Sequence, residues 1–332
     1  MKVAFQTGAD ASDISGFTDA FNGKPGNRET LTAILNGLCR REVNSLFHYN
    51  TKDILKNGSI SAEGYNIRFV HGNDQESVTY FAYEDSADLN DFDVIFVRGD
   101  DFDETTQDKT TLIDALDRPV LVNSGKATLA TRDKFELHRR FGDSSIMPIT
   151  VCATDDLDIQ EAWEAIPGSR LVVKGRYGSS AEEVACVPRT REGITQASEY
   201  LKAWGPSVIQ EFMQEIVEGD YRVHTVEGEV LGTLLRKSAD GGFINNISAG
   251  GNFFPVKMLP KQVLDAVNET LRKFPEVFFQ GMDVTVEGRL IETNAFPASL
   301  SNLNDLDRKH HEDRLLDKVY AQIQEQDRLK SA

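Results

Sequence analysis

The chain has 332 residues and is 40% hydrophobic, so we expect two or three folded domains rather than a disordered chain. Its formal net charge is −17, because 53 acidic residues outnumber 36 basic ones, and the basic residues form no block. Nucleic-acid backbones and anionic membranes both require clustered Lys and Arg, so we expect neither as a partner. We find no signal peptide, no membrane-length apolar run and no C-x-x-C pair, and we expect a reduced, soluble, cytoplasmic protein.

The first third of the chain alternates strand and helix patterns. A strand is predicted at 3–5, and a helix follows Asn27 because apolar residues then recur at helical spacing over 31–38. Further strands are predicted at 67–70, 78–83, 94–97 and 120–122. This alternation predicts an α/β layer of Rossmann-like type. The polar stretch 8–26 fits either a loop beside a site or a plain connection.

The middle of the chain predicts two strands joined by a loop that contains glycine and serine. The strands cover 171–174 and 184–187, and the loop covers 175–180. A strand that delivers Lys174 to such a loop can hold phosphate, because the ammonium supplies charge and the loop amides supply donors. The alternative is an ordinary strand that ends in a surface lysine.

A β-hairpin pattern near the end of the chain brings acidic residues together. If residues 287–288 form a two-residue turn, Asp283 lies opposite Glu292, and Asn294 shares the face of Glu292. Facing carboxylates repel one another unless a cation lies between them, and Mg²⁺ prefers oxygen ligands that it shares with substrate phosphates. The trio therefore predicts a magnesium site, with a solvated edge face as the alternative.

An earlier hairpin pattern offers two arginines. A two-residue turn at 227–228 puts Arg222 opposite Thr233, so Arg236 falls on the other face unless a bulge intervenes. Of the two arginines, we therefore favour Arg222 as the cation of a site on this sheet, because it shares a face with Asp220.

Taken in chain order, these motifs resemble the ATP-grasp superfamily, in the branch that contains bacterial glutathione synthetases and ribosomal-protein glutamate ligases. The matching segments are 93–98, 122–124, 133–135, 147–150, 172–174, 178–180, 210–213, 219–222, 246–251, 283 and 291–297. The resemblance implies an α/β (α+β) ATP-grasp fold behind an N-terminal Rossmann-like domain. It implies a substrate-side domain at 1–122, a central ATP-grasp subdomain at 123–208 and a C-terminal subdomain with the magnesium site at 209–332.

The resemblance also implies roles for individual residues. The implied ATP contacts are Lys134, Lys174, Ser179, Gln210, Glu211, Phe212, Met213 and Asp220. Among these, the lysines hold phosphates, 211–213 contacts adenine and Asp220 meets the sugar. The implied substrate contacts are Arg98, Gly250 and Gly251, and the implied catalytic residues are Arg222, Arg236 and Asn246. Asp283, Glu292 and Asn294 match the magnesium ligands; two ions are expected, with Mn²⁺ as an alternative metal.

Two features depart from the family pattern. Ile244 stands where relatives often carry an arginine, so one cation for the phosphates is missing. Glu182 and Glu183 stand where the loop of relatives is rich in glycine, and they either point outward or tune which substrate approaches.

The implied activity is that of an ATP- and Mg²⁺-dependent ligase that joins a carboxylate to an amine or thiol through an acyl phosphate. Its expected substrates are an amino acid or a small peptide. The sequence is compatible with a homo-oligomer but does not decide the oligomeric state. Two alternatives remain. One is a small-molecule kinase on the same fold, because residues 294–297 also resemble the end of the magnesium motif in inositol-phosphate kinases. The other is a nucleotide-binding module that has lost turnover. The net charge of −17 argues against the polyanionic substrates of such kinases.

Overall fold

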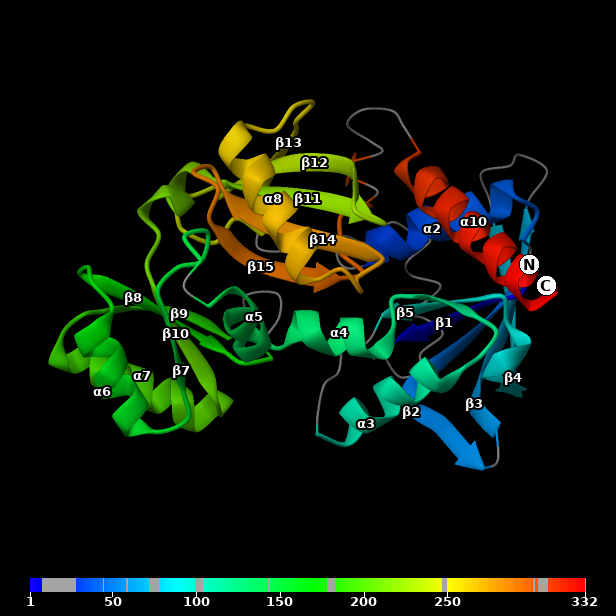
Figure 1. Ribbon diagram of the computed structural model, residues 1–332, viewed down its shortest axis with the longest axis horizontal. Coiled ribbons are helices and arrows are strands. Elements are labelled where there is room, and N and C mark those ends of the chain that lie inside the picture. The colour runs from blue at the N-terminus through cyan, green and yellow to red at the C-terminus, as the bar shows by residue number, and fades with distance from the viewer. Residues whose placement is uncertain are drawn as a thin grey trace.

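Three β-sheets organise the molecule, with the N-terminal and the four-stranded sheets at opposite ends and the five-stranded sheet between them (Figure 1). The structure is a computed structural model. It describes residues 1–7, 28–43, 45–57, 59–71, 78–98, 104–142, 144–177, 183–246, 250–300, 302–303 and 310–331. The polar stretch 8–26 and the predicted cap Asn27 lie outside the described residues.

The N-terminal sheet has six strands in the order β4-β3-β2-β1-β5-β6. Its strands are β1 (Val3–Thr7), β2 (Ser45–Asn57), β3 (Ser59–His71), β4 (Val78–Asp88), β5 (Val94–Arg98) and β6 (Val120–Val122). The helices of this part are α2 (Arg28–Arg40), η1 (Leu89–Asp91), α3 (Glu104–Leu112) and η2 (Ile113–Ala115). Strands β2, β1, β5 and β6 run parallel, which confirms an α/β layer, whereas β3 and β4 extend it by antiparallel pairing.

The four-stranded sheet is antiparallel, in the order β7-β10-β8-β9. Its elements are β7 (Thr150–Ala153), α6 (Asp156–Ala165), β8 (Arg170–Gly175), β9 (Val184–Pro188), α7 (Arg191–Trp204) and β10 (Ser207–Glu211). Leu171, Val173 and Ile209 lie in one core with apolar residues of α6 and α7. Because side chains alternate along a strand, Val172, Lys174 and Gln210 lie on the opposite face. The two helices thus leave that face free for a site.

The five-stranded sheet has the order β13-β12-β11-β14-β15. Its strands are β11 (Asp220–Val226), β12 (Glu229–Lys237), β13 (Asn252–Pro255), β14 (Phe279–Thr285) and β15 (Leu290–Ala295). Helices α4 (Gly125–Arg132), α5 (Lys134–Phe141) and α8 (Lys261–Lys273) share a core with Val223, Met282 and Val284 on one face of the sheet. The short helix η3 (Gln214–Glu218) connects β10 to β11. The other face therefore takes Arg222 and Asp283, which lie opposite each other on β11 and β14.

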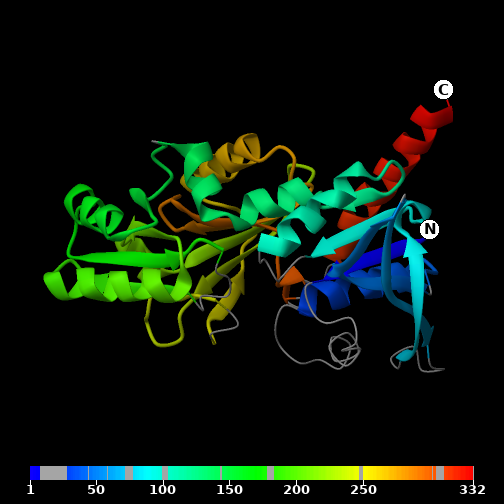
Figure 2. The same ribbon diagram turned by 90° about the horizontal axis from the view of Figure 1, so that it is seen from below.

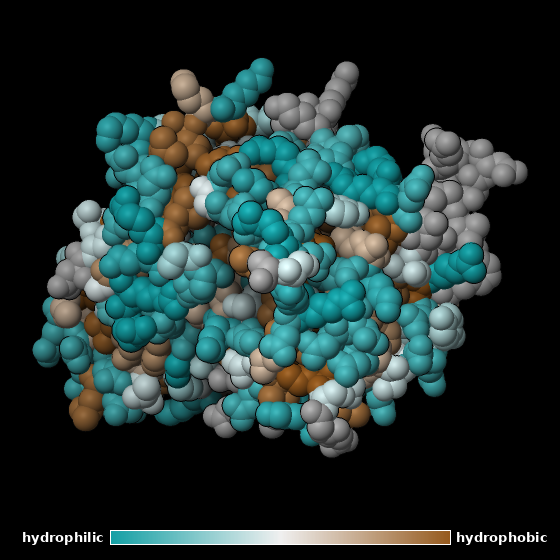
Figure 3. Space-filling model, turned by 45° about the vertical axis from the view of Figure 1, so that its right-hand side comes forward, coloured by the Kyte–Doolittle hydropathy of each residue, from teal (hydrophilic) through white to brown (hydrophobic). Residues whose placement is uncertain are grey.

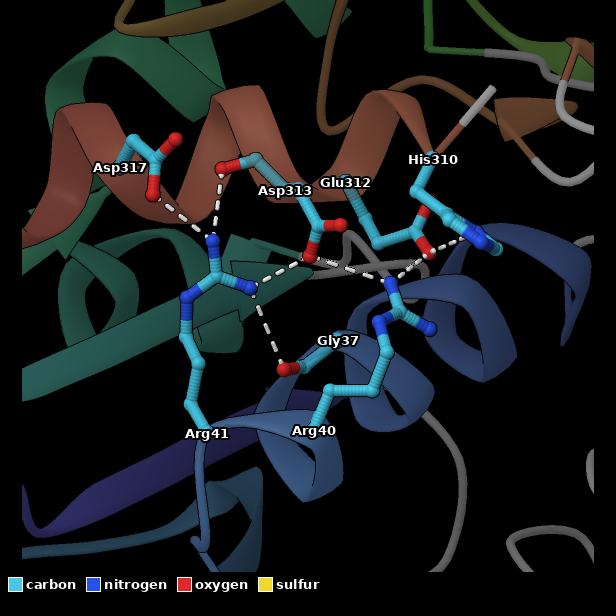
Figure 4. A network of polar contacts seen from close by, with 7 residues as sticks. All are labelled: Gly37, Arg40, Arg41, His310, Glu312, Asp313 and Asp317. Atoms are coloured by element: carbon cyan, nitrogen blue, oxygen red, sulfur yellow. Dashed lines mark hydrogen bonds and ion pairs between the residues drawn. The ribbon is translucent and has the colours of Figure 1, made fainter.

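The C-terminal helix α10 (His311–Ser331) returns to the N-terminal part and lies along α2. Arg41 contacts Asp313 Oδ1 at 2.5 Å and Asp317 Oδ1 at 2.7 Å, and Arg40 contacts Glu312 Oε1 at 2.5 Å (Figure 4). Apolar residues of α10 share one core with the N-terminal sheet and with part of the five-stranded sheet. The two ends of the chain are therefore packed together, and α10 projects beyond the N-terminal sheet (Figure 2).

The exposed side chains and the state of the cysteines agree with what the sequence predicts. Hydrophilic side chains cover most of the face that Figure 3 presents. Cys39, Cys152 and Cys186 are free, as their spacing predicts. Within the described ranges, we find no helix with the length and apolar character needed to cross a membrane.

Gly37 should be the most sensitive position in the contact between α2 and α10. A Cβ atom there would lie 2.7 Å from Leu316 Cδ1 and 2.9 Å from Glu312 Cγ. We expect Gly37→Ala to lower the free energy of unfolding by about 1 kcal/mol, because overpacking outweighs the helix propensity that alanine adds. Urea unfolding measures the change. Asn36→Ala on the exposed side of the same helix is the control and should not destabilise the protein.

Candidate active site

A cleft opens between the free face of the four-stranded sheet and the charged face of the five-stranded sheet. One wall carries Lys174 and Gln210, and the other carries Asp220, Arg236 and Asp283. The described residues that line the cleft are Lys134, Val172, Lys174, Val184, Gln210, Glu211, Phe212, Met213, Ile216, Asp220, Arg236, Phe243, Ile244, Asn245, Asn246, Asp283, Ile291 and Glu292. One end of the cleft is thus apolar and the other is densely charged.

The β14–β15 hairpin brings the two predicted acids face to face. Asp283 pairs with Glu292, as predicted, and the Asn294 amide donates a hydrogen bond to Glu292 Oε1 at 3.0 Å. The predicted two-residue turn is wrong, because the Thr285 amide bonds to the Arg289 carbonyl and Val284 pairs with Leu290. A bulge between Asp283 and Val284 then restores the predicted register.

The β11–β12 hairpin corrects the expectation for the arginines. A register shift between His224 and Thr225 places Arg222 opposite Leu234 rather than Thr233. The same shift places Arg236 directly opposite Asp220, on the face that we had expected it to miss. Arg236 lines the cleft, and Arg222 does not belong to the set of described lining residues. The bulge therefore makes Arg236, not Arg222, the arginine of the cleft wall.

Alternating charges link β12, β11 and β14 beneath the cleft. Arg236 Nη2 lies 2.7 Å from Asp220 Oδ1 and 2.9 Å from Asp283 Oδ2, while Arg222 Nε lies 2.9 Å from Asp283 Oδ1. All four side chains are buried. Burial raises the pKa of Asp283 to about 6, and the two guanidinium groups offset only part of this effect. Burial opposes the charge of Arg236 too, but Asp220 and Asp283 outweigh it and raise the pKa of Arg236.

The charges across the cleft favour an ionised Glu292. Burial raises the pKa of Glu292, but Lys134, Arg222, the Asn294 hydrogen bond and Lys174 together outweigh it and bring that pKa to about 2. Desolvation lowers the pKa of Lys174 to about 8, although Glu292 opposes the shift. Desolvation also lowers the pKa of Lys134. Lys134, Lys174 and Arg222 thus act electrostatically on the Glu292 carboxylate. The positive groups suit a polyanionic ligand, and the carboxylate suits a metal cation bound to that ligand.

The chemistry of the donor set fits a magnesium ion. Asp283 Oδ1 is buried and, despite the nearby arginine, receives no hydrogen bond from any residue that the structure describes. Glu292 faces it from β15, and Asn294, two residues further along the same strand, has an amide oxygen that could serve as a third ligand. Three clustered His, Cys, Asp or Glu side chains are not found anywhere in the described ranges. Because Mg²⁺ usually completes its shell with waters and substrate phosphates, two carboxylates and one amide are sufficient protein ligands.

The apolar end of the cleft surrounds Phe212. Arg170 stacks over the Phe212 ring at 4.0 Å, and the ring of Phe243 lies edge-on at 5.9 Å. The Glu211 carboxylate turns to Arg289, with contacts of 2.6 and 3.1 Å. Phe243 and Arg289 were not predicted, because no local motif marks them. The predicted adenine-contact segment 211–213 does line the cleft.

The loop after β12 is held by a buried asparagine that the sequence motifs did not reveal. The Ser238 amide donates to Asn245 Oδ1 at 2.7 Å, and Asn245 Nδ2 donates to the Ile216 carbonyl at 2.9 Å. This anchoring brings the neighbouring Asn246 and Ile244 to the cleft. Ile244 adds an apolar surface there.

The predicted substrate contacts are not among the described lining residues, although the Gly251 amide donates a hydrogen bond to the carbonyl of Asn246, which lines the cleft. Arg98 ends β5 in the N-terminal sheet, and neither Arg98 nor Gly250 nor Gly251 belongs to the described lining of the cleft. Gly250 has φ +86°, and a Cβ atom at Gly251 would lie 2.4 Å from the Asn245 carbonyl oxygen, so both positions require glycine. Ser179 lies outside the described residues.

The acidic pair of the loop is only partly described. Glu182 lies outside the described residues, whereas the carboxylate of Glu183 lies against Gly175. The charge of Glu183 also favours the ionised form of Lys134.

The chain is similar to ATP-grasp proteins in sequence and in fold. The family model "Prokaryotic glutathione synthetase, ATP-grasp domain" matches residues 137–308. A probable alpha-L-glutamate ligase of Aliivibrio fischeri is 29% identical over 149 residues, which is 44% of this chain and 49% of the relative. The chain thus spans about half the length of such curated relatives.

Solved structures agree on the fold. D-alanine–D-alanine ligase from Bacillus anthracis has a TM-score of 0.61 at 14% identity and covers 98% of each chain. The ATP-grasp ligase PsnB, complexed with a phosphomimetic precursor variant, Mg and ADP, has a TM-score of 0.57 at 15% identity over 96% of this chain and 98% of its own. The family model covers 172 of 332 residues, more than half of the chain. The chain therefore belongs to the family of the prokaryotic glutathione synthetase ATP-grasp domain.

Proposed function

We propose that the protein is an ATP- and Mg²⁺-dependent ligase that joins a carboxylate to an amine or thiol through an acyl phosphate. The observation that carries this proposal is the meeting of Lys134 and Lys174 with Asp283 and Glu292 in one cleft that has an apolar end. Such a cleft offers an apolar place for a base, cations for phosphates and oxygen ligands for a metal. The glutamate-ligase relatives and ligase-fold neighbours support the same class.

In this proposal, the reaction needs no protein nucleophile. Lys134 and Lys174 bind the phosphates, and Arg236 neutralises charge that develops on the transferring phosphoryl group. Glu292, Asp283 and Asn294 would hold Mg²⁺, which supplies further charge neutralisation when bound. The acceptor carboxylate attacks the γ-phosphorus, ADP leaves, and the amine then displaces inorganic phosphate from the acyl phosphate. The chain thereby contributes position and charge rather than a covalent step.

Finer parts of the assignment are proposals as well. We assign substrate binding to 1–122, and the two halves of the nucleotide clamp to 123–208 and 209–332. We further assign Arg98, Gly250 and Gly251 to the substrate and Asn246 and Arg222 to catalysis. Arg98, Gly250, Gly251 and Arg222 are not among the described residues that line the cleft, whereas Asn246 is one of them. We expect two metal ions, amino-acid or small-peptide substrates and a cytoplasmic location.

Product analysis with substrate pools tests the proposed function. The protein is incubated with ATP, Mg²⁺ and pools of amino acids and short peptides, and products are detected by mass spectrometry. Release of free phosphate that requires both an acid and an amine, with a condensed product, is the expected result. ADP with a phosphorylated product and no free phosphate would instead identify a kinase. Bound ATP without any product would identify a module that has lost turnover.

The protonation of Lys174 should set the upper pH limit of nucleotide binding. Its pKa is about 8 before phosphate binds, and only the charged form attracts phosphate. The binding constant of ADP should therefore stay level up to about pH 8 and then fall by up to tenfold per pH unit, because binding must take up a proton. Isothermal titration at pH 7 to 9.5 measures this. Lys174→Arg keeps its charge and should remove this decline, whereas an unchanged decline in that variant would contradict the assignment.

A further inference from the structure

Lys134 lies where helix α4 ends and helix α5 begins. It is the first residue of α5, and Asp133 caps both helices. The Asp133 amide donates to the Leu129 carbonyl at 3.1 Å, and Asp133 Oδ1 accepts from the Phe135 amide at 2.9 Å. Both helices share the core of the five-stranded sheet. The backbone of Lys134 is therefore fixed to that sheet, whereas its distance from Lys174 depends on how this junction meets the four-stranded sheet.

Arg176 connects the junction to the four-stranded sheet, from a position directly after β8 and two residues after Lys174. Arg176 Nε lies 2.8 Å from Asp133 Oδ1, and its Nη2 lies 2.6 Å from Asp133 Oδ2, so the guanidinium group binds the carboxylate through both oxygens. The Arg176 carbonyl accepts a hydrogen bond from the Lys134 amide at 3.1 Å. The guanidinium carbon also lies 4.6 Å from the centre of the Phe135 ring. Arg176 thus contacts Lys134 and both of its neighbours in the chain.

Arg176 is itself anchored on the side of the four-stranded sheet. Its amide donates to the Pro206 carbonyl at 2.9 Å, in the connection between α7 and β10. Its guanidinium group is engaged by Asp133, and Arg176 does not belong to the set of described residues that line the cleft. These contacts are those of a residue that positions another residue, rather than of one that binds the ligand itself.

We propose that Arg176 is a positioning residue that sets the distance between Lys134 and Lys174, the two lysines assigned to the phosphates. Lys174 comes from the four-stranded sheet and Lys134 from a helix packed on the five-stranded sheet, yet both must reach the phosphates of one nucleotide at the same time. A bidentate pair between Arg176 and Asp133 opposes rotation as well as separation of the two parts. The inference rests on the proposed use of a nucleotide and adds a residue that binds no ligand atom.

A double-variant cycle with ADP tests whether Arg176 acts through Lys134. We expect Arg176→Met to weaken ADP binding about tenfold, because Lys134 loses its fixed position. In a Lys134→Met background, the same substitution should weaken binding by less than about twofold, because the side chain that it positions is already gone. Isothermal titration of the four proteins measures the affinities. An equal loss in both backgrounds would overturn the inference, since a general loosening of the fold does not depend on Lys134.

Two further variants separate the ion pair from damage to the fold. Asp133→Asn keeps a side-chain oxygen that can cap α5 but removes the charge that binds Arg176, and it should reproduce the loss of ADP affinity. Arg139→Met removes an arginine from the exposed side of the same helix and should leave ADP affinity unchanged. Unchanged affinity in Asp133→Asn would overturn the inference, even if Arg176→Met fails to fold. Failure of the wild-type protein to bind ADP would overturn the proposed function as well.

Discussion

Glu292→Gln should reduce ATP-dependent ligation about a hundredfold to a thousandfold, the scale expected when a main electrostatic contact of the transition state is lost. Glu292 faces Asp283 across the hairpin, and the charges of Lys134 and Lys174 help hold it ionised. Glutamine keeps the size and the hydrogen-bonding oxygen but removes the charge. Steady-state phosphate release with saturating substrates measures the loss, and titration with Mg²⁺ should show a weakened metal dependence.

Glu287 offers a matched control in the same hairpin. Its side chain is exposed in the turn and is not among the described residues that line the cleft. Glu287→Gln removes the same charge from the chain and should leave phosphate release unchanged. If Glu292→Gln retains full turnover, Glu292 cannot be the metal ligand, and the assignment of the site fails.

The two hairpins explain why sequence reasoning located one pair of residues and misplaced another. Around Asp283 and Glu292, the real turn shifts the register by one residue and a bulge shifts it back. Around Arg222 and Arg236, a single bulge shifts the register and nothing compensates. Both turns carry Glu-Gly, and strand alternation alone does not reveal a bulge. A correct pairing can therefore follow from an incorrect turn.

The N-terminal sheet shows a second limit of prediction from sequence. Strand β2 was not predicted, because its register breaks between Tyr49 and Ile54 and polar residues fill the interruption. The parallel strands β1, β5 and β6 are short, apolar and buried, and their patterns were visible. The fold class could thus be predicted from its buried strands. The strands predicted at 67–70 and 78–83 fall within β3 and β4, but their antiparallel pairing beside β2 was not predicted.

Within the candidate site, residues in motifs were predictable and residues joined only in space were not. Lys174 ends an apolar strand before a glycine-bearing loop, and this local pattern singles it out. Arg289 contacts Glu211 from 78 positions away, in a turn whose sequence is ordinary. The ring of Phe243 lies edge-on to that of Phe212 and comes from a loop without periodicity. Such contacts depend on how two sheets meet, which a local pattern does not encode.

Arg236→Met should cause the largest loss of stability of the variants considered, about 3–5 kcal/mol in the free energy of unfolding at pH 7. Arg236 is 3% exposed and bridges two carboxylates, those of Asp220 and Asp283. Methionine fills much of the space but leaves Asp220 without this ion pair and Asp283 with Arg222 alone. Urea unfolding of the purified variant measures the loss.

The pH dependence of that loss distinguishes uncompensated charge from poor packing. Without Arg236, the pKa of Asp283 in the folded protein should rise further above its unfolded value, because one of the two guanidinium groups that lower it is gone. The folded state then binds more protons than the unfolded state, so the deficit relative to wild type should shrink as the pH falls from 7 to 5. A packing defect would be independent of pH over this range.

A second substitution provides the control for Arg236→Met. Asp220→Asn in the same chain removes the carboxylate that Arg236→Met leaves without its ion pair. The double variant should therefore be more stable than the sum of the two single losses predicts. Strict additivity, or an Arg236→Met variant as stable as wild type, would contradict a stabilising role of the ion pairs among Asp220, Arg236 and Asp283. If these ion pairs stabilise the sheet as expected, Arg236, which lines the cleft, cannot be removed without loosening the sheet that carries Asp283.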